Sequence, residues 1–140
     1  MPTRRENVLS AVFSRLGTIN GPSVLRNEVL PVRIPEAGLI ILRDGDPGEP
    51  DVTLNPRSEY YSHRIPIEVI TSGDESALDD LLIAVGEVFA SDETLGGLAE
   101  MLVIQAPEVG AMPVENAATI RHATVPLVVG YLVRNPLAEE

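Results

Sequence analysis

The strongest constraint on the fold is the stretch from Ser72 to Ile104, which has the pattern of a one-sided helix followed by a short strand. Its apolar residues recur at intervals of three and four, the repeat of a helix that buries one face. This apolar stripe comprises Leu78, Leu81, Leu82, Val85, Val88 and Phe89, and the opposite face carries Asp79, Asp80 and Glu87. A helix of this kind needs an apolar layer to cover, so the pattern predicts a sheet packed beneath it.

The ends of this helix have their own signals. Ser72 and Glu75 stand at the spacing of an N-terminal capping box, in which two side chains satisfy free backbone N–H groups. Beyond the helix, Leu95-Gly96-Gly97 predicts a turn, because glycine tolerates backbone angles that other residues resist. Met101–Ile104 then reads as a short strand.

A second amphipathic helix is predicted at residues 4–16. Val8, Leu9, Val12, Phe13 and Leu16 fall on one helical face. Thr3 and Glu6 repeat the capping-box spacing before this face, and Gly17 follows it as a C-terminal stop. Both ends of this helix are therefore marked locally.

Runs of β-type residues supply the sheet. We expect strands at residues 39–42, 59–71, 101–104 and 117–134, with a proline-interrupted edge strand in 24–34. In the two long strands, alternate residues share a face. Tyr61, His63, Ile65, Ile67 and Val69 share one face, as do Val125, Leu127, Val129, Tyr131 and Val133. The predicted fold is α+β, with a mixed, mainly antiparallel sheet of about five strands and two helices packed on one face.

Chain length and the positions of proline and glycine complete the predicted organisation. A chain of 140 residues corresponds to a single domain spanning residues 1–140. Pro66 predicts a bulge or a free edge within its strand, and Pro126 predicts a break in the last ladder. Segments 44–57 and 106–116 are rich in proline and glycine, so we expect long exposed loops there.

Composition excludes several classes of function. The formal net charge is −11, and all ten basic residues are arginine. Such an acidic chain is not expected to bind nucleic acid specifically, because phosphate binding needs a basic face. The absence of cysteine excludes disulfides and thiolate metal sites, and no segment is long and apolar enough to span a membrane.

A search for catalytic residues finds no recognisable constellation. His63 and His122 are the only histidines, and both lie in predicted strands, where we interpret them as half-exposed structural residues. Asp44-Gly45-Asp46 lacks the later glutamate of a calcium loop and is read as an acidic turn. We therefore expect no enzyme activity, metal or cofactor, although a buried cleft holding His63 beside two carboxylates would favour an enzyme.

Several of these segments together resemble the tail terminator family of long-tailed phages, the group of the lambda minor tail protein U. The resemblance covers most of the chain but is diffuse. The matching segments are Glu6 to Leu16, Arg64 to Ile70, Leu78 to Phe89, Thr94 to Gly97 and Val125 to Tyr131.

The resemblance implies a structural role in the virion tail, assembled in the bacterial host cytoplasm. Family proteins form a hexameric ring that caps the tail tube, stops its growth and joins tail to head. The implied partners are further copies of the chain, the tail-tube protein and the head-tail connector proteins. The free protein can be monomeric, with loops that order on assembly, which would here be segments 44–57 and 106–116.

Residues for subunit contacts follow from this role. We expect Arg43, Arg57 or Arg64 to pair with carboxylates of a neighbouring copy, so that assembly depends on salt. Tyr60 and Tyr61 face opposite sides of one strand, so one is expected in the core and the other, Tyr60, at an interface. The acidic candidates are Asp44 and Asp46. The alternative to a tail protein is a small α+β binding or regulatory module with no catalytic activity.

Overall fold

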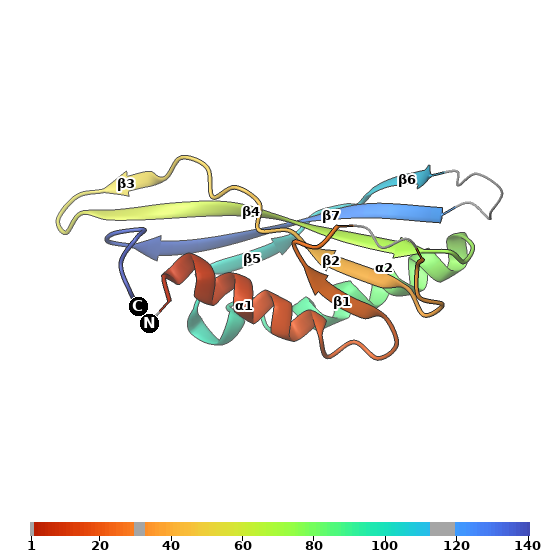
Figure 1. Ribbon diagram of the computed structural model, residues 1–140. Coiled ribbons are helices and arrows are strands. Elements are labelled where there is room, and N and C mark those ends of the chain that lie inside the picture. The colour runs from red at the N-terminus through yellow and green to blue at the C-terminus, as the bar shows by residue number, and fades with distance from the viewer. Residues whose placement is uncertain (1, 30–32, 113–119) are drawn as a thin grey trace.

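The structure is a computed structural model that describes residues 2–29, 33–112 and 120–140. Two helices, α1 and α2, lie on one face of a long mixed sheet, and both chain ends lie near one end of it (Figure 1). In chain order the elements are α1 Arg4–Leu16, β1 Ser23–Arg26, β2 Leu39–Leu42, β3 Asp51–Thr53, β4 Ser58–Thr71, α2 Glu75–Ala90, the 3-10 turn η1 Leu95–Gly97, β5 Met101–Ile104, β6 Glu108–Met112 and β7 Ile120–Val133.

The α+β class and the placement of both helices on one face are confirmed. In the described residues, however, the sheet has seven strands and not about five. Its main order is β1-β2-β4-β7-β5, while β3 pairs with β4 and β6 pairs with β7. The two additional strands lie inside segments predicted to be loops, and the sheet is mixed because β1 runs parallel to β2.

Helix α1 has the predicted bounds. Thr3 caps it, since its hydroxyl oxygen accepts from the Glu6 backbone N–H at 3.2 Å. The Glu6 carboxylate does not complete the capping box, because it binds Arg26 on the neighbouring strand. Val8, Leu9, Val12 and Leu16 are fully buried, as the stripe predicts.

Helix α2 begins later than the predicted cap. Asp74, not Ser72, is the N-cap, and its carboxylate accepts from the Ala77 backbone N–H at 2.9 Å. Aspartate caps a helix as well as serine does, so the capping-box spacing was the wrong criterion here. The apolar stripe is confirmed, because Leu78, Val85 and Phe89 are buried.

Strands β4 and β7 form the central ribbon of the sheet. Each is 14 residues long, and they pair in one unbroken antiparallel register from Glu59 opposite Val133 to Thr71 opposite Arg121. The break predicted at Pro126 is therefore wrong. Pro66 lies directly opposite Pro126. Both ring nitrogens point away from the β4–β7 ladder, so that ladder loses no N–H donor.

Each of the two prolines lies between the segments of its strand that pair with two different outer strands. On the outer side of β4, β2 pairs with residues 67–70 and β3 with residues 58–60. On the outer side of β7, β5 pairs with residues 127–130 and β6 with residues 120–124. Pro66 and Pro126 fall between these pairings, so their missing N–H groups leave no ladder incomplete. The carbonyls still accept, from Arg43 at 3.0 Å and from Gln105 at 2.9 Å.

The segment predicted as a long loop, 44–57, follows the edge of β4 instead. Arg43 donates its backbone N–H to Pro66, and Arg64 donates to Asp46. Residues 43 to 46 thus span three steps opposite the two steps from Pro66 to Arg64, and this extra residue is a β-bulge beside Pro66. Residues 51–53 then form β3. The segment is therefore not a long loop, and its ordering on assembly stays a prediction.

The edge predictions are partly confirmed. An edge strand does occur within residues 24–34, but it is β1, at 23–26. Ile34 is outside any strand and packs with Leu39, Ile41 and Ile70 in a small second core, while Leu30 and Val32 lie outside the described residues. In segment 106–116, residues 108–112 form β6, and 113–116 lie outside the described residues, as do 117–119 of the last predicted strand.

The main core lies between the helices and the inner face of the sheet. The alternation predicted for the two long strands is confirmed, because His63, Ile65, Ile67 and Val69 of β4 are fully buried on this face. Residues 125, 127, 129, 131 and 133 of β7 are buried beside them. No helix of the described residues covers the opposite face of the β4–β7 ribbon (Figure 1), and the features described next lie on or near this uncovered face.

Candidate assembly surface

Two of the predicted interface arginines are paired within the chain. Arg43 Nε lies 2.7 Å from Glu68 Oε2, and Arg57 Nη2 lies 3.3 Å from Glu59 Oε1. Arg64 is exposed on the uncovered face and has no ion-pair partner among the described residues. Of the three arginines, Arg64 is therefore the one that can meet an outside carboxylate without breaking an existing pair.

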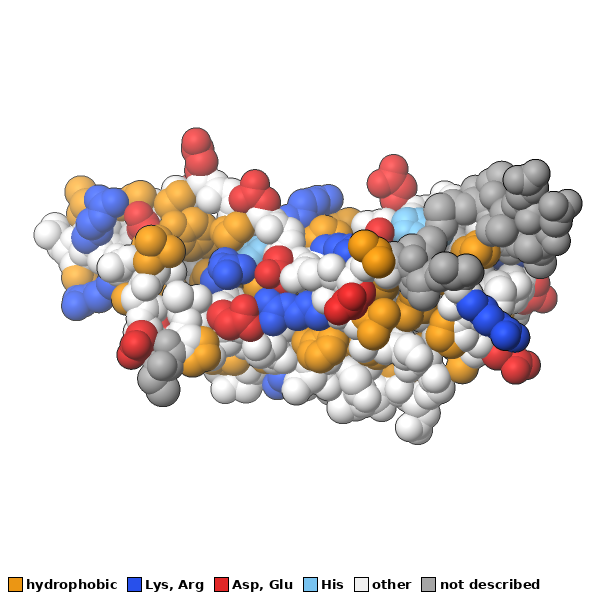
Figure 2. All heavy atoms as spheres, in the orientation of Figure 1, with side chains coloured by type: hydrophobic (Ala, Val, Ile, Leu, Met, Phe, Trp, Pro, Cys, Tyr) orange, Lys and Arg blue, Asp and Glu red, His pale blue; other side chains and the backbone are white. Residues whose placement is uncertain are grey.

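Asp44 belongs to a charged joint between α1, β1 and the bulge. It accepts from the Arg26 guanidinium at 3.0 Å and from the Asn27 amide at 2.9 Å, while Arg5 lies 3.6 Å away. Arg26 also holds Glu6 through two contacts of 2.7 and 2.9 Å. Arginine suits this geometry because its planar group donates in two directions. Figure 2 shows red and blue side chains intermixed on the side of α1 and β1.

The electrostatics of this joint follow from its contacts. The Arg26 hydrogen bonds lower the pKa of Glu6, although burial opposes them. Burial alone would raise the pKa of Asp44, but hydrogen bonds from Arg26 and Asn27 outweigh it and leave that pKa lowered. The two carboxylates in turn raise the pKa of Arg26. The joint is thus internally neutralised and serves the fold.

Asp46 makes a local turn, as predicted for an acidic turn. Its carboxylate accepts from the Gly48 backbone N–H at 2.8 Å. Within the described ranges, no group of three or more histidine, aspartate or glutamate side chains is placed to hold a metal ion. None of the described helices is long and apolar enough to cross a membrane.

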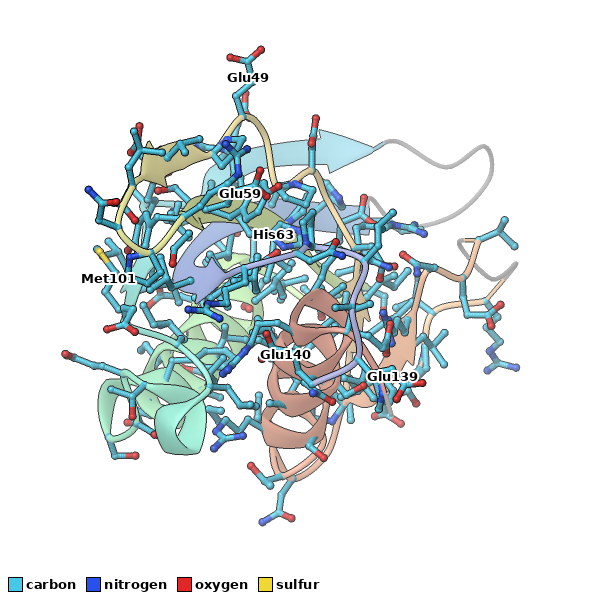
Figure 3. All side chains as sticks on the ribbon, turned by 90° about the vertical axis from the view of Figure 1, so that its left-hand side faces the viewer. Glu49, Glu59, His63, Met101, Glu139 and Glu140 are labelled. Carbon is cyan, nitrogen blue, oxygen red and sulfur yellow. The ribbon has the colours of Figure 1, made fainter. Side chains whose placement is uncertain are left out.

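His63 is the residue that sequence reasoning placed wrongly. It is not half-exposed but fully buried on the inner face, with Nε2 at 2.6 Å from the Asp44 backbone oxygen and Nδ1 at 3.0 Å from the Tyr131 hydroxyl. A carbonyl only accepts, so Nε2 carries the proton and Nδ1 accepts from Tyr131. Figure 3 shows His63 in the interior, well away from Glu139 and Glu140.

Burial sets the protonation of this pair. It lowers the pKa of His63, an effect that the Asp44 carbonyl only partly offsets, and raises the pKa of Tyr131 to about 12. Beside Tyr131 lies a cavity of about 260 Å³, lined by Arg5, Tyr61, Val133 and the chain at 47–48 and 136–137. The two ring nitrogens of His63 contact a phenol and a backbone carbonyl. A buried cleft with His63 beside two carboxylates, the arrangement that would favour an enzyme, is not what the described residues form.

The two adjacent tyrosines face opposite sides of β4, as expected. Tyr61 packs against the main core and lies 5.9 Å from Tyr131, measured between ring centroids. Tyr60 faces the uncovered side, where its ring lies over Gly130 of β7 and would collide with any larger residue there. Leu132, its register partner, is 42% exposed. Whether Tyr60 contacts a neighbouring copy stays a prediction.

The uncovered face and the strand next to it expose apolar side chains. Met101 is 45% exposed and Val103 is 42% exposed, and both lie on β5, which ends the sheet. At the other end of the main strand order lies β1. Soluble proteins usually protect sheet edges with charge or proline, whereas the four residues of β5 are all apolar.

Comparison with known proteins finds likeness only at the level of structure. No protein-family model matches the chain, and no curated protein matches it in sequence. A solved structure described as the virion of a native gene transfer agent particle contains a similar chain, with a TM-score of 0.54 and 15% sequence identity. The match covers 88% of this chain and 93% of that chain. At this identity, the likeness shows that the two chains share a fold.

Proposed function

We propose that this chain is a structural protein of a phage-like virion and, more specifically, a tail terminator that caps the tail tube as a ring. The main support is the shared fold with a chain of a gene transfer agent virion, which extends over nearly the whole of both chains. The resemblance of its segments to the tail terminator family gives the narrower role.

The geometry suits such a role. The sheet has a face without helices and two free ends to its main strand order, which are surfaces for contact between proteins. The buried histidine is held by a carbonyl and a phenol that serve the fold. The proposed partners are further copies in a hexameric ring, the tail-tube protein and the head-tail connector, and the proposed location is the virion tail.

The structure reduces the number of candidate residues for subunit contacts. Arg64 and Tyr60 lie on the uncovered face and remain the main candidates for subunit contacts. Arg43, Arg57, Asp44 and Asp46 already have partners within the chain. Exposed charges interact over about 8 Å at physiological salt and over longer distances at low salt, so we expect association to change with ionic strength.

Gene deletion in the strain that produces the particles tests the role. Without a terminator, tail tubes should grow past their normal length or remain detached from heads, as seen by electron microscopy of the lysate. A plasmid copy of the gene should restore normal tails. Particles with normal, joined tails in the deletion strain would refute the proposal.

A further inference from the structure

Among the described residues, the two strands that end the main strand order, β1 and β5, each pair with one other strand, and they differ in the charge of the chain around them. β5 lies at the end of a region, residues 72–104, with eight carboxylates and no basic residue. β1 lies in a region, residues 1–43, with six arginines and three glutamates, a formal charge of +3. Figure 3, viewed from one end of the sheet, shows Met101 on the side away from β1. We infer that copies associate head to tail, with β5 of one copy pairing with β1 of the next; this rests on the proposed ring-forming function.

The outer edge of β5 offers free backbone groups. Gln105 donates its N–H to Pro126 of β7, and these residues stand in the same register as the rest of β5 and β7. Because N–H groups alternate sides along a strand, those of Leu102 and Ile104 point away from β7. Beside this edge is a hollow of about 380 Å³, lined by Phe89, Leu102 and Ile104 among others. An extended segment can thus add to the sheet and cover apolar surface.

Strand direction selects β1 of another copy as that segment. β1 is parallel to β2, and the pairs β2–β4, β4–β7 and β7–β5 are all antiparallel. β1 and β5 therefore run in opposite directions within one chain. Copies related by rotation about an axis parallel to the strands would place β5 antiparallel to β1 of the next copy. A contact between two different edges of this kind forms a ring when the rotation returns to the first copy.

The side chains of the two strands also match by face. Val24 of β1 packs against the main core, so Ser23 and Leu25 point to the opposite face of the sheet, where Leu25 packs against the second core. On β5, Leu102 is buried inward, whereas Met101 and Val103 point to the uncovered side. A register that places Ser23 opposite Val103 keeps apolar inward residues together on both strands.

Charge favours this unlike contact over a contact between two β5 edges. Of the eight carboxylates in residues 72–104, Asp92 pairs with Arg15 and Glu75 pairs with Arg121. The other six have no ion-pair partner among the described residues, and Glu93 and Glu100 are exposed close to β5. Two β5 edges would bring these unpaired acidic side chains together. On the β1 side, Arg26 is already neutralised by Glu6 and Asp44, so pairing β5 with β1 avoids this repulsion.

Cysteine cross-linking tests the pairing directly, because the chain has no cysteine of its own. Paired antiparallel strands hold their Cα atoms within disulfide range. In the Ser23→Cys/Val103→Cys double variant, oxidation of concentrated protein should give a ladder of covalent oligomers on a non-reducing gel. Each single variant should stay monomeric. Dimers from Val103→Cys alone, or no ladder from the double variant, would overturn the inference.

Charge reversal provides a second test with a matched control. Glu100→Arg adds positive charge beside β5 and should weaken association about fivefold or more at low salt, measured by analytical ultracentrifugation. Glu49→Arg makes the same change in net charge at an exposed site in the 44–50 segment, where Figure 3 shows its side chain pointing away from the body, and it should not weaken association. Equal effects of the two variants would contradict edge-specific pairing.

Failure of the edge pairing is distinguishable from failure of the proposed function. If deletion of the gene gives overlong tails while the double cysteine variant still caps tubes without forming a ladder, the protein is a terminator whose copies join by another surface. If deletion leaves normal tails, the terminator role itself is wrong, whatever the cross-linking shows.

Discussion

Replacement of Gly45 by alanine is predicted to be among the most damaging single changes outside the core. Gly45 lies in the bulge beside Pro66 with a φ of +68°, a conformation that costs an L-residue roughly 1–2 kcal/mol. An added Cβ would also collide with the backbone carbonyl of Arg64 and lie 2.9 Å from the Pro66 ring. The first obstacle is backbone, so the bulge must move away from β4.

That movement has a cost that follows from the contacts at the bulge. The Asp44 carbonyl would leave His63, whose buried Nε2–H then loses its acceptor at a cost of roughly 1–3 kcal/mol. The Arg64 to Asp46 backbone bond, at 3.4 Å, would be lost as well. Together with the strained φ, Gly45→Ala should lower the free energy of unfolding by roughly 3–5 kcal/mol.

Gly48 provides the matched control. It lies three residues further on, with a φ of +72°, but an added Cβ there has no atom within 4 Å. Gly48→Ala should therefore cost only the strained φ, roughly 1–2 kcal/mol. Urea unfolding followed by circular dichroism measures both variants. Equal losses of stability in the two would refute the role assigned to the close approach between bulge and β4.

Three further predictions concern single side chains. Because the pKa of His63 is lowered in the folded state, the unfolded chain binds the extra proton first, and stability should fall as pH drops below about 6.5. This pH dependence, read from urea midpoints, should be weaker in His63→Gln. Phe89→Ala should cost roughly 3–5 kcal/mol, since Phe89 is 2% exposed, whereas Ile83→Ala, at 51% exposure, should cost under about 0.5. Arg26→Gln should cost about 1–3 kcal/mol in thermal unfolding, because two carboxylates lose their shared partner.

Each of these has a contrary result. A pH dependence unchanged in His63→Gln would mean that other groups cause it. Similar losses for Phe89→Ala and Ile83→Ala would contradict the assigned buried face of α2. An Arg26→Gln protein as stable as the parent would show that the charged joint between α1, β1 and the bulge does not contribute to stability.

The helices show how far a local pattern carries. The apolar stripe of α1 and its Thr3 cap lie within one segment of chain, so their periodicity was sufficient to predict both bounds. The same periodicity predicted the buried face of α2 but not its start, because Asp74 competes with Ser72 as a cap. Alternation in β4 and β7 likewise predicted which residues face the core.

The short strands show where local pattern fails. β3 spans three residues and β6 lies in a segment with glycine and flanking prolines, so neither has a readable alternation. Each is held by a long strand that already exists, through a ladder to β4 or β7. β1 is likewise fixed by parallel pairing with β2. Their stability depends on pairing with a neighbouring strand, because the few residues of each short strand have no strand pattern of their own.

The candidate site follows the same division. Charge counts along the chain already separate an acidic region at 72–104 from a basic region at 1–43, a signal that net charge alone conceals. The sequence by itself determined the class of the fold, the helix faces and the long central strands, because 3.6- and 2-residue periods are local. Only the tertiary structure decided that His63 is buried, that Arg43 is already paired with Glu68, and that β1 and β5 lie at the two ends of the main strand order. Those outcomes depend on which distant segments lie side by side, and this is set by packing of the whole chain.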